Sequence, residues 1–248
     1  LAVVMIVGRV GAAQAESMRT LFTKENRLPG KGHLEVGVLG SYTELIDANE
    51  AVSAGDRDEL EAEAYLRYGV TDEFVLVGRV PYLELRPDIG EGESGVGDAS
   101  VGFELLAFQD IFDYPFIIPH ADVLMDTGDE DEGLGRGELS VLTGISFGSK
   151  MYDVITLIVD LNYEIFEDSE NIAGLAGSIV WDVSDRFAFL GEAMVTDEDL
   201  PDRDSRPTTF LGGMSYMVTD DLQMAVYGGG AKNTDEDVIV ATKISYTF

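Results

Sequence analysis

The feature that most restricts the fold is strict alternation at the end of the chain, from Asp237 to Phe248. One face of this stretch holds Val238, Val240, Thr242, Ile244, Tyr246 and Phe248, and the other holds Ile239, Ala241, Lys243, Ser245 and Thr247. A period of two residues indicates a β-strand. Its apolar face needs either the core of a soluble sheet or the lipid around a membrane barrel, whose lumen would take the polar face. The rest of the chain has to decide between these two.

The same alternation recurs along the chain from Gly32 onwards. Its clearest case opposes Ile155, Leu157, Val159, Leu161, Tyr163 and Ile165 to Thr156, Ile158, Asp160, Asn162 and Glu164. No stretch keeps the 3.6-residue period of an amphipathic helix. No apolar run reaches the roughly 18 residues of a membrane-spanning helix. We therefore expect an all-β protein, which can span a membrane only as a closed barrel, because only helices and closed barrels satisfy their backbone in lipid.

Two kinds of connection alternate between the predicted strands. The short ones repeat an aromatic-x-Val-Ser/Thr-Asp pattern, at Tyr68–Asp72, Trp181–Asp185 and Tyr216–Asp220. Ser, Thr and Asp side chains cap tight turns, and the aromatic residue would join the girdle at a membrane interface. The longer connections are strongly acidic and fall near residues 46–57, 87–95, 126–136, 167–171, 196–206 and 232–237. Short turns at one end and longer loops at the other are typical of outer-membrane barrels.

These connections divide residues 32–248 into about twelve strands, an even number as in single-chain bacterial barrels. The expected strands are 32–46, 57–70, 73–87, 97–108, 114–126, 136–148, 153–166, 171–183, 186–196, 207–218, 221–231 and 237–248. The sequence thus predicts a transmembrane antiparallel up-and-down β-barrel in the bacterial cell outer membrane, with both ends on the periplasmic side. A soluble β-sandwich would also alternate, but it would not combine this loop asymmetry with a signal peptide and an aromatic end.

The N-terminus shows the pattern of a secretory signal peptide. An apolar start leads to Ala13-Gln14-Ala15, an A-x-A cleavage site, so residues 1–15 indicate a truncated signal peptide cleaved before Glu16. The next segment, residues 16–31, concentrates basic residues in an otherwise acidic chain: Arg19, Lys24, Arg27 and Lys31. We expect a loose periplasmic segment here, because chain ends are usually loose. A plug folded back into an acidic lumen is the alternative.

Composition restricts the partners. The chain has a formal net charge of −31 and no cysteine. This charge would repel phosphates, so a nucleic-acid partner is not expected and cations are favoured. The lack of cysteine excludes a disulfide framework and a thiolate metal site. We expect a monomer without a cofactor.

If the apolar faces meet lipid, the inner face of the barrel is acidic. The residues expected to line the pore are Glu61, Glu63, Arg67, Arg79, Glu104, His120, Asp122, Asp160, Asn162, Glu164 and Lys243. Further acids expected on this face are Glu35, Glu59, Glu138, Asp182 and Glu192. The strands hold too few bases to pair with all these acids, which predicts a hydrated, cation-preferring lumen. A sealed barrel is the alternative. In the strand from Phe74 to Leu85, Arg79 and Glu84 fall on opposite faces, which leaves its orientation open.

The sequence also contains candidate residues for a metal site and for a lipid hydrolase. The loop with Asp126, Asp129 and Asp131 is a weak candidate for Ca²⁺, because it offers oxygen ligands but lacks the Gly and Glu spacing of an EF-hand. We expect no specific metal site and a solvated external face. A lipid hydrolase would need an outward His beside an outward Ser. His33 and His120 have no such neighbour and G-x-S-x-G is absent, so we expect no catalytic residue.

Two sets of residues resemble known outer-membrane proteins. Tyr246 and Phe248 match the C-terminal signature of bacterial outer-membrane barrels, which implies an assembly signal for the barrel-assembly machinery. The runs Gly95-Val96-Gly97-Asp98, Asp126-Thr127-Gly128-Asp129 and Leu134–Gly137 resemble the G-x-G-D, P-T-G-D and L-G-x-G elements of the outer-membrane "transporter" family linked to the meta-pathway of phenol degradation. Asp126 stands where that family usually has proline. The resemblance implies an outer-membrane barrel that takes up small compounds, aromatic or other hydrophobic ones among them.

The sequence therefore predicts an outer-membrane channel for passive uptake of small solutes through an acidic, cation-preferring lumen. Its expected surroundings are the lipid bilayer and lipopolysaccharide. The alternative is a structural or surface-interaction barrel whose acidic loops bind divalent cations, lipopolysaccharide or a partner.

Overall fold

The computed structural model describes residues 18–45, 57–88, 90–110, 114–197, 206–232 and 236–248. The predicted signal peptide, residues 1–15, and parts of the acidic loops lie outside these ranges. The strands are β1 (Leu34–Leu45), β2 (Arg57–Gly69), β3 (Phe74–Pro87), β4 (Glu93–Val96), β5 (Ser100–Leu105), β6 (Phe108–Gln109), β7 (Phe116–Leu124), β8 (Ser140–Met151), β9 (Ile155–Phe166), β10 (Ile172–Ser184), β11 (Phe187–Thr196), β12 (Thr208–Met217), β13 (Leu222–Lys232) and β14 (Glu236–Thr247). Among the described residues, no helix is long and apolar enough to cross a membrane.

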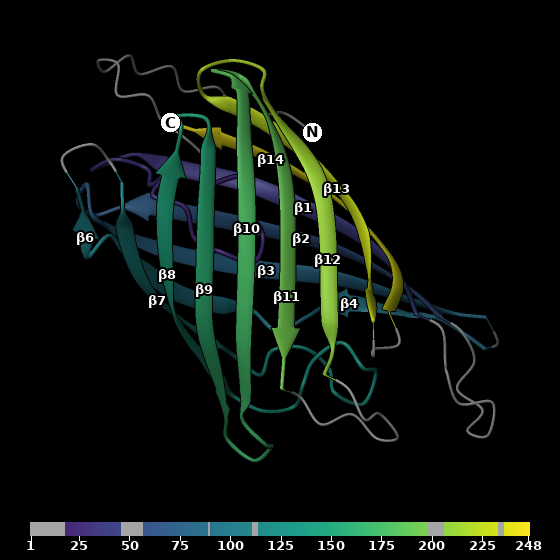
Figure 1. The fold of residues 1–248 in the computed structure, drawn as a ribbon. Coiled ribbons are helices and arrows are strands. Elements are labelled where there is room, and N and C mark those ends of the chain that lie inside the picture. The colour runs from purple at the N-terminus through teal and green to yellow at the C-terminus, as the bar shows by residue number, and fades with distance from the viewer. Residues whose placement is uncertain (1–17, 46–56, 89, 111–113, 198–205, 233–235) are drawn as a thin grey trace.

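The strands form a closed 12-strand antiparallel barrel (Figure 1). Neighbours in sequence pair with one another, and β1 closes the ring by pairing with β14. At this seam Phe248 N donates to Leu34 O at 2.8 Å, and Val36 lies opposite Tyr246. The short turns lie at the end where β1 begins, and the longer loops lie at the other end (Figure 1). The predicted all-β barrel and its strand number are confirmed.

One barrel position is broken into three strands, where the sequence predicted a single strand 97–108. Both β4 and β5 pair with β3, and β6 pairs with β7. The first break follows Gly97, because Asp98 leaves the ladder and turns its carboxylate towards the loop after β7. The second break lies at Leu106, whose N–H donates to Glu73 O. The strand predicted at 136–148 likewise begins only at Ser140, because residues 136–139 belong to the same loop.

The two faces of each strand separate as the alternation predicts. On β14, Val240, Ile244 and Tyr246 are exposed on the outside, whereas Ala241 and Lys243 are buried inside. Exposed large apolar side chains on the outside suit lipid, because they need no protein core. On β3, Arg79 points inward, and Glu84 pairs with Arg86 at an exposed site. The open question about this strand is thereby answered, because Glu84 lies close to the strand's end at Pro87.

The repeated short turns close on a hydroxyl group. Thr71 Oγ1 accepts from Phe74 N at 3.0 Å, Thr219 Oγ1 accepts from Leu222 N at 3.0 Å, and Ser184 Oγ accepts from Phe187 N at 3.1 Å. The aromatic residues of the same repeats, Tyr68, Trp181 and Tyr216, are exposed on the outer wall. The Ser/Thr of the repeat thus fixes the turn, and the aromatic residue lies at the barrel surface near it.

Candidate functional site

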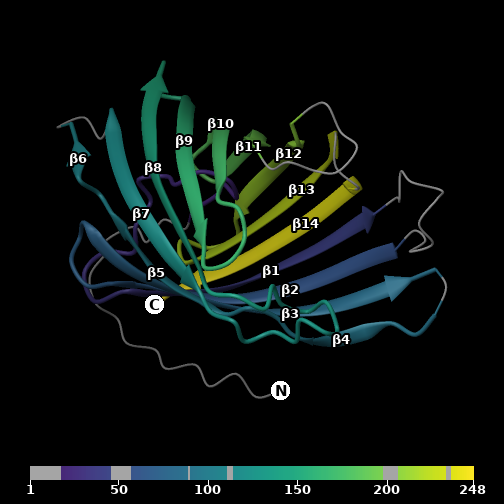
Figure 2. The same cartoon turned by 90° about the horizontal axis from the view of Figure 1, so that it is seen from below.

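The N-terminal segment, residues 18–33, enters the barrel and forms a plug (Figure 2). Leu21 N and Phe22 N donate to the Glu192 carboxylate at 2.9 and 3.0 Å, and Thr23 Oγ1 donates to Ser178 Oγ at 2.9 Å. Glu192 and Ser178 are inward side chains of β11 and β10. The expectation of a loose tail is therefore wrong for these residues, because their backbone donors are satisfied by the inner wall.

The plug also contacts the inner wall at β13 and β14. Lys243 Nζ on β14 donates to Met18 O at 2.9 Å, and Tyr227 on β13 donates to Arg19 O. Leu21 packs against an apolar cluster on the inner wall, made of Val180, Ala188, Leu190, Ala225, Tyr227 and Ala241. The plug is thus held by polar contacts at several strands and by one apolar anchor.

The basic residues of the plug neutralise acids of the lumen. Arg19 pairs with Glu25 at 2.8 Å within the plug and with Asp182 of β10. Lys24 Nζ lies 3.7 Å from Glu104 Oε1. The prediction that lumen acids outnumber their possible partners counted only the bases of the strands. It is wrong for this end of the lumen, because the plug supplies further cations.

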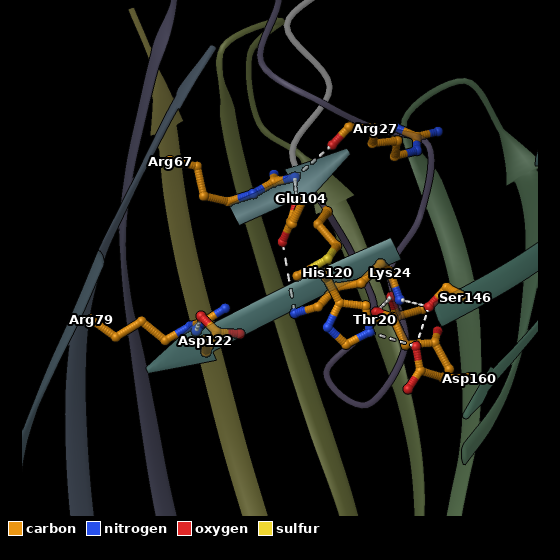
Figure 3. A network of polar contacts seen from close by, with 12 residues as sticks. Thr20, Lys24, Arg27, Arg67, Arg79, Glu104, His120, Asp122, Ser146 and Asp160 are labelled. Carbon is orange, nitrogen blue, oxygen red and sulfur yellow. Dashed lines mark hydrogen bonds and ion pairs between the residues drawn. The ribbon is translucent and has the colours of Figure 1, made fainter. Parts of the chain in front are cut away.

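A second cluster joins the wall to the plug through Arg67 of β2 (Figure 3). Its guanidinium donates to Glu35 at 2.6 Å, to Glu104 at 2.7 Å and to Arg27 O at 3.1 Å. Tyr65 Oη donates to Glu35 at 3.0 Å. All these wall side chains are buried. A buried charge is tolerated only with partners of this kind. Arg67 therefore holds together the wall and the part of the plug around Arg27.

His120 belongs to a third cluster (Figure 3). Its Nε2 lies 2.9 Å from Asp160 Oδ2, and Ser146 Oγ donates to the same oxygen. Lys24 N in turn donates to Ser146 Oγ at 2.9 Å. The order of contacts is Ser–Asp–His, so the histidine does not face the hydroxyl as a nucleophile–base pair requires. The cluster supports the plug, and it offers no geometry for hydrolysis.

Within the plug, Glu25 is held as a carboxylate. Burial alone would raise the pKa of Glu25, but the guanidiniums of Arg19 and Arg27 outweigh it and hold the pKa at about 2. Arg19 N and Nε also donate to this carboxylate, at 2.6 and 3.1 Å. The Arg19–Glu25 pair therefore stays charged over the whole physiological range.

A loop between β7 and β8, residues 125–139, is locked by Asp98. One carboxylate oxygen of Asp98 accepts from Thr127 N at 3.1 Å and from Gly128 N at 2.9 Å, and the other accepts from Arg136 N at 2.8 Å. Gly128 and Gly135 touch, so that a Cβ on Gly135 would come within 2.7 Å of the Gly128 carbonyl carbon. The three glycine-rich runs noted in the sequence thus form one unit, which we call the Asp98 lock.

Between the plug and the Asp98 lock lies a cavity of about 610 Å³. Met18 and Lys24 of the plug border it, and Leu134 and Arg136 of the lock border it as well. Six of the predicted pore-lining residues line this cavity: Glu61, Glu63, Arg67, Arg79, Asp122 and Lys243. Whether solute passes along them stays a prediction.

The other predicted residues lie elsewhere on the inner wall. Glu104, His120 and Asp160 are buried beside the plug. Asn162 Nδ2 donates to Asp160 at 3.1 Å, and Glu164 accepts from Arg136 at 2.7 Å. Sequence reasoning left the plug residues Arg19, Lys24 and Glu25 out of the site, although their local basic excess was the available clue.

Two acidic sites take structural roles. Glu138 was expected in the lumen, but it accepts from Asp168 N at 2.7 Å and from Ser169, which places it with the loops beyond the strands. Asp129 accepts from Asp131 N at 3.0 Å inside the Asp98 lock. Among the described residues, no group of three or more His, Cys, Asp or Glu is arranged to hold a metal ion.

Comparisons with known proteins identify the fold. The chain superposes on an outer membrane channel from Pseudomonas putida F1 with a TM-score of 0.73 at 14% identity, covering 97% of this chain and 100% of the other. The KdgM porin gives 0.58 at 11% identity over 86% and 99% of the two chains. The β domain of the Bordetella autotransporter BrkA gives 0.58 at 9% identity over 88% and 99%.

At these identities the likeness establishes an outer-membrane barrel and nothing finer. Channels and an autotransporter domain share it, so the fold does not choose among their roles. No protein-family model and no curated protein sequence matches the chain. The resemblance to the phenol-degradation family is therefore confirmed only in its coarser part, the outer-membrane barrel.

Proposed function

We propose that this barrel is an outer-membrane channel for passive uptake of small solutes through an acidic, cation-preferring lumen. The observation that carries the proposal is the cavity above the plug, which keeps acidic side chains of β2 inside a closed, lipid-compatible wall. Uncompensated carboxylates in a confined space attract cations and repel anions. Small aromatic or other hydrophobic compounds are the solutes that the family resemblance implies.

Passage requires the plug to move. The plug fills the lumen where Glu192, Ser178 and Ser146 bind its backbone, and these contacts are hydrogen bonds and ion pairs of a kind that water can replace. A gated channel follows, in which the plug sets how often the lumen is open and the acids above it set which ions enter.

The test is planar-bilayer recording of the refolded mature protein under a KCl gradient. We expect discrete openings with a cation-selective reversal potential that Glu59→Gln/Glu61→Gln weakens. The matched control is Glu167→Gln/Glu170→Gln, which removes the same charge from the exposed β9–β10 turn. Anion selectivity, or selectivity that the cavity variant leaves unchanged, would contradict the proposal.

A second function is favoured by the same plug. A plug that stays in place would seal the lumen, which suits a structural or surface-interaction protein whose acidic loops bind divalent cations, lipopolysaccharide or a partner. Complete absence of openings from a folded barrel, verified by heat-modifiable gel migration, would favour this role. For both functions we propose that Tyr246 and Phe248, exposed at the seam with ring centroids 4.7 Å apart, are read by the barrel-assembly machinery.

A further inference from the structure

Two ladders of opposite character run side by side along the cavity wall. Inward residues of β2 form an acidic ladder of Glu59, Glu61 and Glu63. Their direct partners on β3 form an apolar ladder, in which Leu85 faces Glu59, Leu83 faces Glu61 and Pro81 faces Glu63. Directly paired residues on one face of a sheet have Cβ atoms about 5 Å apart. A carboxylate and an apolar surface therefore lie within reach of one small molecule at each level.

At the end away from Arg79, the acidic ladder forms no ion pair with a base in the described part of the chain. The five bases that line the cavity are engaged with other groups. Arg79 pairs with Asp122 at 2.5 Å, Arg67 with Glu35 and Glu104, Lys24 with Glu104 and Arg136 with Glu164, and Lys243 donates to Met18 O. Of the ladder, Glu63 lies 4.0 Å from Arg79. None of the ion pairs among the residues that the structure describes includes Glu59 or Glu61, and Glu61 lies opposite Ser41 of β1 in the sheet.

The apolar ladder continues into a wall around the cavity. Leu124 of β7, Leu142 of β8 and Leu134 of the Asp98 lock all line it, and Leu134 is only 3% exposed. Ser100 of β5 lines the cavity as well, directly opposite Arg79 of β3. A cavity of about 610 Å³ lies in the range of small-molecule sites.

The same geometry disfavours an inorganic ion held by the ladder alone. Carboxylates at alternate positions of one strand are roughly 7 Å apart along the chain, because each residue rises by about 3.3 Å. A divalent metal needs several oxygens converging within about 2.6 Å. No such convergent group occurs among the described residues. A diffuse monovalent charge on an organic molecule suits a row of separated carboxylates better.

We propose that this cavity binds small organic cations with an apolar body, that is, aryl- or alkylammonium compounds. The ammonium group lies against Glu59 and Glu61, and the apolar body lies against Leu83 and Leu134. The inference rests on the proposed function in one respect, because it names the class of solute that the channel would select. Binding itself needs no ion flow, so the two can be tested apart.

The experiment is calorimetric titration of the refolded barrel in detergent with three probes, each corrected by a micelle blank. Phenethylammonium has both the charge and the apolar body, ethylammonium has almost only the charge, and 2-phenylethanol has only the body. We expect phenethylammonium to bind at least about tenfold tighter than either, since burying a phenyl ring adds more than about 1.4 kcal/mol. Glu59→Gln/Glu61→Gln should remove the preference over 2-phenylethanol, which lacks the charge, and Glu167→Gln/Glu170→Gln should keep it.

Several outcomes would overturn the inference. Equal binding of phenethylammonium and ethylammonium would show that the apolar wall takes no ligand. Unchanged phenethylammonium binding in Glu59→Gln/Glu61→Gln would remove the acids from the site. Complete displacement by micromolar Ca²⁺ would make the ladder an inorganic cation site. A barrel that conducts KCl but shows any of these results keeps the proposed channel, and one that binds phenethylammonium selectively but never conducts keeps only the inference.

Discussion

The two halves of the lumen differ in whether their acidic side chains are bound by neighbouring groups. Towards the end with the short turns, Glu104, Asp182 and Glu192 are bound by the plug or by Arg67. Towards the end with the longer loops, Glu59 and Glu61 border a cavity and take part in none of the ion pairs among the described residues. The contrast shows that the acidity of a barrel interior says little about permeation until the positions of its cations are known.

The largest effect is expected from a substitution that breaks the ion pairs of the plug. Arg19→Ala leaves Glu25 and Asp182 in the lumen without their shared cation, and breaking a buried ion pair is destabilising by about 3–5 kcal/mol. We expect the plug to leave the lumen and single-channel conductance to rise severalfold, as measured in planar bilayers.

The control for this change is Arg186→Ala. Arg186 pairs with Asp220 at 3.2 Å, but both side chains are largely exposed, and exposed pairs contribute about 0–1 kcal/mol. Its conductance should equal that of the wild type. Equal conductance of Arg19→Ala and Arg186→Ala in folded barrels would show that the plug is not held by its charges.

A smaller effect is expected from a substitution that loosens the Asp98 lock beside the cavity. Asp98→Ala removes the acceptor of three backbone N–H groups, and each hydrogen bond to a charged group contributes about 1.5–3 kcal/mol in a protected setting, less where water competes. The lock should loosen, and trypsin should cleave after Arg136 faster than in the wild type.

The matched control for the lock is Asp131→Ala, an exposed acid of the same loop. It removes the same charge without touching the three N–H groups. Identical cleavage rates at Arg136 in Asp98→Ala and Asp131→Ala would mean that Asp98 does not hold the loop.

The smallest effect is the pH dependence of plug opening, which tests whether the Arg19–Glu25 pair holds the plug in the lumen. The pKa of Glu25 is about 2 inside the barrel and would return to 4.5 on release, because burial raises it less than Arg19 and Arg27 lower it. A lowered pKa means that the pairing is complete above the released value and is lost as the pH falls from about 4.5 towards 2. The open probability that the plug sets should therefore stay constant between about pH 8 and pH 5 and rise only in stronger acid. An opening transition near neutral pH would assign control of the plug to another group.

The wall of this barrel was predictable from sequence to a large extent. A period of two gives each residue only two possible orientations, so Lys243 and Asp160 were placed inside and Tyr246 outside correctly. The repeated Ser/Thr turns marked the strand ends, since Thr71 and Thr219 do cap them. Local patterns suffice here because neighbouring strands in the sequence are also neighbours in space.

The contents of the lumen were not predictable in the same way. Residues 18–33 have no periodicity, and a basic segment is compatible with a tail and with a plug alike. Their position depends on contacts between residues far apart in the sequence, such as Met18 with Lys243 and Arg19 with Asp182. The Asp98 lock has the same character, because Asp98 meets Arg136 across a strand hairpin. Glu138 was misplaced for the same reason, since its partner lies in the next loop.

The course of the plug also has a consequence for how the molecule is assembled. The plug directly precedes β1, yet it is bound by Tyr227 of β13 and Lys243 of β14, which are made last. These contacts can form only when the C-terminal strands reach the N-terminal one. Docking of the plug on these two strands is therefore tied to sealing of the seam, and an unfinished barrel can hold its plug only by its contacts to earlier strands, such as β8, β10 and β11.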